Sequence, residues 1–232
     1  RKSYGLQSMA DFKAKILESH FDGMLLQIDS RDLWVKLVGG FNAYNLLAVY
    51  ASAILLEQET SKVLVALSEI SGAEGRFETV RSTNGVVGIV DYAHTPDAVE
   101  NVLETIKDLR TVGQQIITVL GCGGDRDKTK RPEMAKVALK YSDKLIITSD
   151  NPRTEDPFQI IKEMEAGVSP EKKKNTFSIA DRREAIRAAV HLANPGDIVL
   201  VAGKGHEKYQ EISGIRHHFD DREELENTFN EQ

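Results

Sequence analysis

The sequence predicts an α/β protein with a Rossmann-like, mostly parallel sheet that carries helices on both faces. From about residue 86 onward, short apolar runs alternate with segments whose apolar residues recur at helical spacing. The runs have no polar face, as expected for strands that are covered on both sides in a parallel sheet. Residues 71–78, with two glycines and a serine, precede this alternation, so we expect a linker there between two parts of the chain.

The first part contains fewer predicted elements. Residues 23–37 read as two short strands around a polar turn at residues 29–32. Residues 42–58 and 61–70 follow, with apolar residues at helical spacing. We therefore expect a short strand pair and two helices before the linker.

Helix starts in the second part are marked by proline or by capping residues. Pro96 and Pro132 suit the first position of a helix, where a backbone N–H is not needed. Asp156 suits an N-cap, and Asp181 with Glu184 has the spacing of a capping box. The predicted helices cover residues 96–110, 132–141, 157–167 and 182–193. The predicted strands cover residues 86–91, 115–120, 145–148, 176–179 and 198–202, and residues 209–219 read as a hairpin.

Composition narrows the class of protein. The chain has 232 residues, of which 41% are hydrophobic, and a net charge of −6, which argues against non-specific binding to nucleic acid or to a membrane surface. The single cysteine, Cys122, excludes an internal disulfide and favours the cytoplasm. The chain starts at Arg1 without a signal-peptide core, and no apolar run is long enough for a membrane span, so we expect a piece cut from a longer protein.

Polar stretches follow four of the predicted strands. They are "DYAHTPD" from residue 91, "GCGGDRDKTKR" from residue 121, "TSDNPRTEDP" from residue 148 and "VAGKGHE" from residue 201. Ligands of open α/β sheets bind beyond the carboxyl ends of the strands. We therefore expect these four stretches to meet at one edge of the sheet.

Two common nucleotide motifs do not fit these stretches. A dinucleotide fingerprint would need glycine where the chain has Arg126, and a Walker A motif would need serine or threonine where Gly205 follows Lys204. No other stretch of the chain fits Walker A, and no His, Cys, Asp and Glu spacing indicates a metal site of the usual kinds. We interpret Cys122 as a small turn residue. We interpret His191, His217 and His218 as structural or solvated, and Lys172, Lys173 and Lys174 as a solvated loop.

The "DNPR" turn, residues 150–153, instead favours an amino-acid ligand. Pro152 fixes its own φ and biases Asn151 towards extended backbone, which would hold Asp150, Asn151 and Arg153 in fixed directions as one anion, one amide and one planar cation. A carboxylate and a planar guanidinium together suit a ligand that has both ammonium and carboxylate groups. Arg126 and Glu207 would complete a site for two zwitterionic ends.

Simpler interpretations of these residues stay open. Arg126 could lie in solvent on a surface turn. Asp91, which could accept hydrogen bonds from a ribose, could equally cap a turn, and His94 could be a partly exposed loop residue.

The four stretches, in this order, resemble the Mur ligases, and in particular the members that add diaminopimelate. The resemblance implies that residues 74–232 are the C-terminal, amino-acid-binding domain. It implies that residues 1–73, with "GGFNAYN" from residue 39, are the end of the central ATP-binding domain, without its P-loop. It also implies a hinge at residues 71–76 and a first part whose helices lack the sheet that they should cover.

The family's binding residues fall on definite positions of this chain. The resemblance assigns meso-diaminopimelate to Arg126, Asp150, Asn151, Pro152, Arg153, Gly203 and Glu207. It assigns ATP to Asn45, Arg76, Asp91 and His94. It assigns no catalytic residue, and it implies that the ligands of Mg²⁺ lie outside these 232 residues.

The implied activity is that of an ATP-dependent amide ligase of peptidoglycan synthesis, which works through an acyl phosphate. Its other substrate would be the UDP-N-acetylmuramoyl dipeptide, bound mainly by domains that this sequence lacks, so we expect the chain alone to be inactive. Two alternatives remain. One is a ligase of the same fold with another substrate, such as a folylpolyglutamate synthetase, which should lack "DNPR". The other is a non-catalytic module that binds an amino acid.

Overall fold

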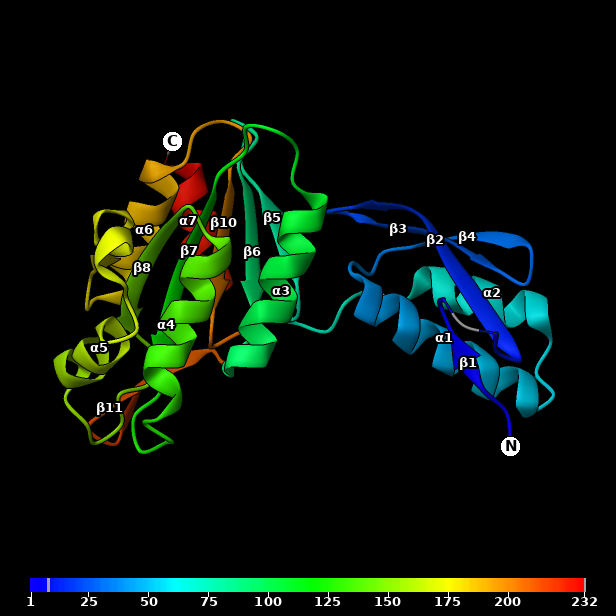
Figure 1. Ribbon diagram of the computed structural model, residues 1–232, viewed down its shortest axis with the longest axis horizontal. Helices are drawn as coiled ribbons and strands as arrows, with labels where there is room; N and C mark the ends of the chain where they lie inside the picture. The colour runs from blue at the N-terminus through cyan, green and yellow to red at the C-terminus, as the bar shows by residue number, and fades with distance from the viewer. Residues whose placement is uncertain (8, 232) are drawn as a thin grey trace. The chain divides into compact units, whose positions relative to one another are not determined.

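The computed structural model describes residues 1–7 and 9–231. The chain divides into two compact units, Arg1–Gly72 and Ala73–Gln232 (Figure 1). None of the helices in the described residues has the length and apolar character that a membrane span requires.

The first unit is a four-stranded sheet with two helices. The turn between the third and fourth strands needs only Asp29 and Ser30, both with left-handed backbone (φ 48° and 64°), as two-residue hairpin turns require. Only the first two strands pair in parallel, and the order follows the sequence. The elements are β1 (Tyr4–Gly5), β2 (Phe12–His20), β3 (Gly23–Ile28), β4 (Arg31–Val35), α1 (Gly40–Leu55) and α2 (Thr60–Glu69).

The expectation that these helices lack a sheet is wrong. Leu47 and Tyr50 of α1 and Leu67 of α2 are buried in one core with Leu26 and Ile28 of β3. The sequence analysis missed β1 and β2. Strand β2 alternates charged and apolar residues and is mostly exposed, so its apolar signal is weak.

The second unit is built on a six-stranded sheet in the order β5-β6-β10-β7-β8-β9. All neighbours pair in parallel except β5, which is antiparallel to β6. The strands are β5 (Glu78–Arg81), β6 (Val87–Asp91), β7 (Ile116–Cys122), β8 (Lys144–Ser149), β9 (Thr176–Ser178) and β10 (Ile198–Ala202), and β11 (Tyr209–Ile212) pairs with β12 (Ile215–His218) in a separate hairpin.

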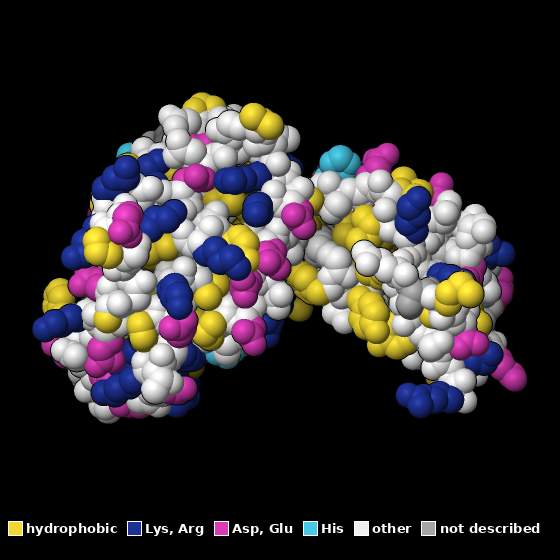
Figure 2. Space-filling model, in the orientation of Figure 1, with side chains coloured by type: hydrophobic (Ala, Val, Ile, Leu, Met, Phe, Trp, Pro, Cys, Tyr) yellow, Lys and Arg dark blue, Asp and Glu magenta, His cyan; other side chains and the backbone are white. Residues whose placement is uncertain are grey.

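Helices cover both faces of this sheet, so the predicted fold class is confirmed. Helices α3, α4 and α5 lie in sequence along one face, and α6 and α7 pack together on the other (Figure 1). Basic and acidic side chains are interspersed over the face of this unit in Figure 2. The helices are α3 (Pro96–Leu109), α4 (Lys130–Tyr141), α5 (Pro157–Glu165), α6 (Arg182–Leu192) and α7 (Asp221–Asn230), with a short 3₁₀ helix at Pro170–Asn175.

Predicted helix starts agree with the structure in three of four cases. Thr95, Asp156 and Asp181 each accept a backbone N–H bond in the first turn of α3, α5 and α6. Helix α4 begins at Lys130, two residues before Pro132, because a tolerated proline can lie anywhere in the first turn. Strand β5 and helix α7 were not predicted, since both are short and rich in charged residues.

Two ion pairs join α6 to α7, and they differ in burial. Arg182 and Asp221 are fully buried and lie 2.7 Å apart, and the Arg182 guanidinium also donates to the carbonyl of Ala202 at 3.1 Å. Arg183 and Glu224 form a pair of the same length, but the Arg183 side chain is 56% exposed. The same two helices therefore offer a buried pair and an exposed pair for comparison.

We expect Asp221→Asn to lower the free energy of unfolding of the second unit by about 3–5 kcal/mol, because it leaves a buried guanidinium without its anion. Arg183→Ala should cost less than about 1 kcal/mol, since water screens the exposed pair. Urea unfolding followed by circular dichroism measures both variants. Trp34, the single tryptophan, lies in the first unit, so its fluorescence transition should stay unchanged. Equal losses in the two variants would contradict the prediction.

Candidate functional site

The second unit has a cavity of about 300 Å³ beyond the carboxyl ends of β6, β7, β8 and β10. The four polar stretches therefore meet at one edge of the sheet, as the sequence analysis expected. A larger hollow of about 690 Å³ lies in the first unit, and its lining comes from β2, β3 and their flanks, with Lys13, Lys15 and Asp29 as its charged residues. The cavity of the second unit is lined by Tyr92, His94, Thr95, Gly121, Cys122, Gly123, Arg126, Lys130, Asp150, Asn151, Arg153, Gly203 and Glu207.

Asn151 is buried and holds Glu207 in place. Its Nδ2 donates to Glu207 Oε2 at 2.7 Å, while its Oδ1 accepts from Lys204 Nζ at 3.2 Å and from the backbone N–H of Glu211 at 2.9 Å. The side-chain amide is thus largely occupied by protein groups. Asn151 positions the Glu207 carboxylate at the cavity rather than presenting a free amide there.

Lys204, which was not predicted to bind any ligand, lies against two residues of the cavity lining, Asn151 and Glu207. It is fully buried, with Nζ 3.5 Å from Glu207 Oε2 and 5.4 Å from the ring centre of Tyr209. Burial lowers the pKa of Lys204, and the nearby charge of Asp150 opposes that shift. Its position between two glycines in "GKGHE" was the available sequence signal, because close backbone packing there forces the lysine inward.

Asp150 and Gly203 belong together. Asp150 is buried, and its Oδ1 accepts the backbone N–H of Asn151 at 2.6 Å. Gly203 has φ 121°, and a Cβ at this position would lie 2.7 Å from Asp150 Oδ2. Glycine is therefore needed at 203 to leave room for the Asp150 carboxylate, which is a shaping role.

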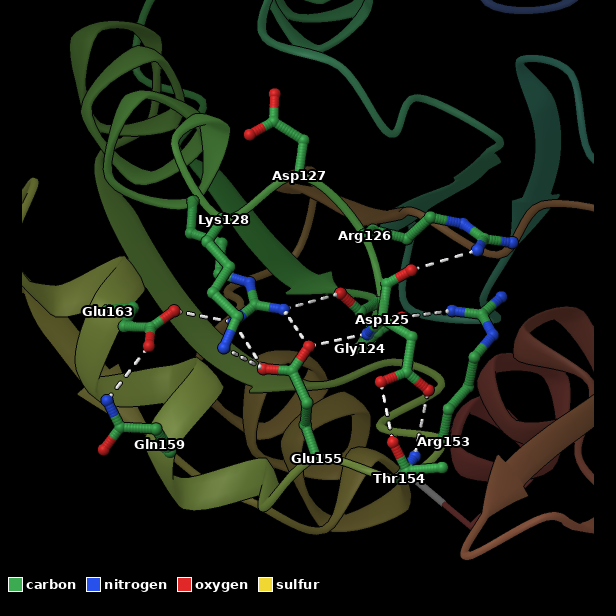
Figure 3. Close-up of polar contacts among 12 residues, drawn as sticks. Gly124, Asp125, Arg126, Asp127, Lys128, Arg153, Thr154, Glu155, Gln159 and Glu163 are labelled. Atoms are coloured by element: carbon green, nitrogen blue, oxygen red, sulfur yellow. Dashed lines mark hydrogen bonds and ion pairs between the residues drawn. The ribbon is translucent and has the colours of Figure 1, made fainter.

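The two arginines of the site are held differently. Arg153 has left-handed backbone (φ 52°), donates its backbone N–H to Glu211 at 3.0 Å, and donates from Nη1 to the carbonyl of Gly124 at 2.8 Å. Arg126 is exposed, and its Nη1 donates to the carbonyl of Asp125 at 3.1 Å. Figure 3 shows the two side chains side by side, and both line the cavity. Pro152, which precedes Arg153, is buried, and its carbonyl accepts the N–H of Glu155 at 3.0 Å.

Three of the four residues that the resemblance assigned to nucleotide binding also lie near this edge. Asp91 ends β6, and its Oδ2 accepts the backbone N–H of Phe77 at 2.8 Å. Burial raises the pKa of Asp91, and hydrogen bonds from the backbone together with the charge of Arg76 oppose that rise. The Arg76 guanidinium lies 4.8 Å from the ring centre of Tyr92, which also contacts His94. Asn45 is exposed on α1 of the first unit.

Neither a cysteine nucleophile nor a metal ion fits the site among the described residues. Cys122 ends β7 and is buried, and burial together with Asp150 raises the pKa of its thiol to about 12, so it is not a nucleophile at neutral pH. Among residues 1–7 and 9–231, no three His, Cys, Asp or Glu side chains converge in a way that could hold a metal ion. The described residues therefore do not fit Mg²⁺.

Residues 75–205 match the family described as "Mur ligase, glutamate ligase domain". A protein of Bacteroides thetaiotaomicron named UDP-N-acetylmuramoyl-L-alanyl-D-glutamate–2,6-diaminopimelate ligase is 56% identical over 98% of the chain, and one of Lactiplantibacillus plantarum with the same name is 52% identical over 82%. The chain spans about half the length of the curated relatives it matches, 47% and 38% in these two cases.

Two solved structures are also similar to this chain. A structure titled as a UDP-N-acetylmuramoyl-L-alanyl-D-glutamate–2,6-diaminopimelate ligase superimposes with a TM-score of 0.71 at 39% identity, over 99% of this chain and 47% of that one. A folylpolyglutamate synthase from Thermotoga maritima superimposes with a TM-score of 0.63 over 83% of this chain and 44% of that one. At 20% identity, the second similarity shows the fold alone.

Neighbouring glycines in the loop after β7 test the geometry of the cavity wall. A Cβ on Gly124 would lie 1.9 Å from the carbonyl oxygen of Pro152, whereas a Cβ on Gly123 would meet only the flexible end of Arg153, at 2.9 Å. We expect Gly124→Ala to lower the free energy of unfolding by about 1–3 kcal/mol, because backbone atoms must move apart. Gly123→Ala should cost less than about 1 kcal/mol. Urea unfolding compares the two, and a smaller loss for Gly124→Ala would show that the loops do not pack as described.

Proposed function

The chain belongs to the Mur ligase family, and from this premise we propose that it is the amino-acid-binding half of a ligase that adds meso-diaminopimelate to UDP-N-acetylmuramoyl-L-alanyl-D-glutamate. The observation that carries the proposal is the pairing of charges around one cavity. Arg126 and Arg153 line it together with Asp150 and Glu207. The two arginines and two carboxylates match the two carboxylates and two ammonium groups of diaminopimelate. Lys130, a third cation in the lining, donates to the carbonyl of His94 at 2.8 Å.

The ammonium ends would bind to Asp150 and Glu207, and the carboxylate ends to Arg126 and Arg153. Asn151 and Lys204 support this arrangement because they hold Glu207 from behind. Gly203 supports it by leaving space beside Asp150. The buried base of the site and its exposed arginine would let the amino acid enter from solvent and lose water as its charges pair.

The reaction that we propose forms an amide through an acyl phosphate. A phosphoryl group from ATP would first be transferred to the acceptor's terminal carboxylate, and the amine of diaminopimelate would then attack the acyl carbon and release phosphate. The chain's own residues would orient that amine and exclude water, which would otherwise hydrolyse the acyl phosphate. Arg76, Asp91 and His94, with Asn45 of the first unit, would bind the nucleotide.

We further propose that residues 1–73 are the end of an ATP-binding domain and that residues 74–232 are the amino-acid-binding C-terminal domain. The 56% identity of the Bacteroides relative extends over both units, which supports their belonging to one enzyme. The ligands of Mg²⁺ and the UDP-sugar site would then come from other parts of that enzyme. The use of ATP and the single buried cysteine fit work in the cytoplasm.

A ligase of folate derivatives is the second candidate, and the cavity argues against it. Such an enzyme would bind glutamate, which has one ammonium group for the two carboxylates, Asp150 and Glu207, that line the cavity. One of these would be left with no ligand ammonium group and only the protein groups that already bond to it, so glutamate would pair with less of the charge of this site than diaminopimelate. Calorimetric titration of the chain with meso-diaminopimelate and with glutamate decides between the two.

We expect Arg126→Met to weaken meso-diaminopimelate binding by roughly 30-fold or more, since an ion pair lost from a desolvated site costs at least about 2 kcal/mol. Lysine has no second carboxylate, so its affinity should change by less than about twofold. Arg126 suits the test because its guanidinium donates only to a neighbouring carbonyl. Arg81→Met, an exposed arginine on β5, controls for the change in net charge. Equal loss for the two ligands would remove Arg126 from the specificity site.

We also expect the 232-residue chain alone to form no ADP above the blank, with or without meso-diaminopimelate. Its sequence contains no Walker A stretch that could cradle the phosphates. A coupled assay for ADP measures this directly. Stoichiometric ADP formation that disappears in Asp91→Asn would overturn the expectation.

A further inference from the structure

The loop after β7, residues 123–128, and the loop after β8, residues 151–155, are joined by a network around a buried arginine (Figure 3). Arg131 of α4 has a fully buried side chain and donates to both oxygens of Glu155, at 3.0 and 2.9 Å. It also donates to the carbonyl of Gly123 at 3.1 Å and to Glu163 at 2.6 Å. A buried guanidinium is tolerated only when it is paired in this way.

Glu155 carries the connection onward to the loop of Arg126. Its Oε1 accepts the backbone N–H of Asp125 at 2.6 Å, and its Oε2 lies 3.0 Å from Lys128 Nζ. Hydrogen bonds from Arg131 and Lys128 lower the pKa of Glu155 to about 2, so the carboxylate is charged at neutral pH. One carboxylate thus joins helix α4 and both loops.

The two loops also bind each other directly. Asp125 accepts from Thr154 Oγ1 at 2.7 Å, and the N–H of Gly124 donates to the carbonyl of Asn151 at 2.8 Å. Asp125 and Arg153 both have left-handed backbone, with φ of 53° and 52°. Such conformations are unfavourable for residues with a Cβ and persist where surrounding bonds determine them. They fix the directions in which the chain presents its two site arginines.

We propose that Glu155, held by Arg131, is a positioning residue for specificity: by fixing the two loops against each other it sets where Arg126 and Arg153 meet the carboxylates of the ligand. The inference rests on the proposed function, because it concerns recognition of an amino acid with two carboxylates. Arg126 is exposed and bonds only to its neighbour's carbonyl, so its place depends on the backbone of its loop. Neither Glu155 nor Arg131 lines the cavity.

The test is Glu155→Gln, which keeps the size of the side chain and removes its charge. The backbone amide of Asp125 should exchange its hydrogen at least about tenfold faster, because its acceptor is weakened. Affinity for meso-diaminopimelate should fall on the order of tenfold or more, since misplaced guanidinium groups pair poorly. Affinity for lysine should fall by a smaller factor, because lysine presents one carboxylate to the displaced arginines and diaminopimelate presents two.

Glu163→Gln is the matched control. Glu163 accepts from the same Nη1 of Arg131 and from Gln159 at 3.0 Å (Figure 3). Among the described residues it makes no hydrogen bond to either loop, although the charge of Lys128 helps to lower its pKa. It should leave Asp125 exchange and the ratio of the two affinities within about twofold of the original chain. Thr154→Val, which removes only the hydroxyl bond to exposed Asp125, should shift that ratio in the same direction by about threefold, even if Glu155→Gln folds poorly.

The outcomes separate the positioning role from the proposed function. If Glu155→Gln and Glu163→Gln weaken both ligands equally, the network only stabilises the fold and the inference is overturned. Unchanged exchange at Asp125 in Glu155→Gln also overturns it, whatever the ligand results. If the original chain binds no meso-diaminopimelate, the proposed function fails, and faster Asp125 exchange in Glu155→Gln alone then shows that Glu155 fixes the loop.

Discussion

Burial of the central strands on both faces leaves only their ends for polar chemistry. All five residues of β6 and of β10, and all seven of β7, are buried, so no side chain along them can face water. Parallel pairing then brings the ends together, since Ala202 pairs with both Asp91 and Leu120, and Cys122 pairs with Ser149. The loops that follow these residues have to share one edge, and the cavity forms where they meet.

Charged and polar residues at this edge divide into two groups by burial. Arg131, Lys204 and Asn151 are fully or almost fully buried and bond to protein groups. Arg126 is exposed and Arg153 half-buried, so their guanidinium groups can still meet a ligand. In the proposed site, Asn151 and Lys204 hold Glu207, and Arg131 acts on the loops of the two arginines through Glu155. A site that distinguishes a ligand with a second carboxylate from one without it needs its exposed cations to be held rigidly.

The edge of the sheet could be predicted from the sequence. Which of its charged and polar residues are buried and which can reach a ligand could not. Helical spacing, capping residues and continuous apolar runs are local properties, so the central strands and α3, α5 and α6 could be predicted from them. Burial of Lys204 and Arg131 depends on glycines and loops that are distant in sequence, and spacing carries no information on that. Asn151 was predicted to present an amide because Pro152 restricts its backbone. Its occupation by Glu207 and Lys204 follows from the fold of the hairpin and the "GKGHE" turn.

The second unit begins beside its own site, and this constrains where the chain can bend. Gly75, with φ 67°, packs so closely on Gly205 and His206 that a Cβ would lie 2.1 Å from the His206 nitrogen. Its N–H donates to Glu78 at 2.8 Å, and the N–H of Phe77 donates to Asp91. Residues 75–77 are therefore anchored to the second unit. The segment that remains for a hinge is narrower than residues 71–76, which the resemblance implied. Helix α2 ends at Glu69, and the carbonyl of Ala73 accepts the N–H of Arg76 at 3.0 Å, so we expect any hinge between the units to lie within residues 70–72.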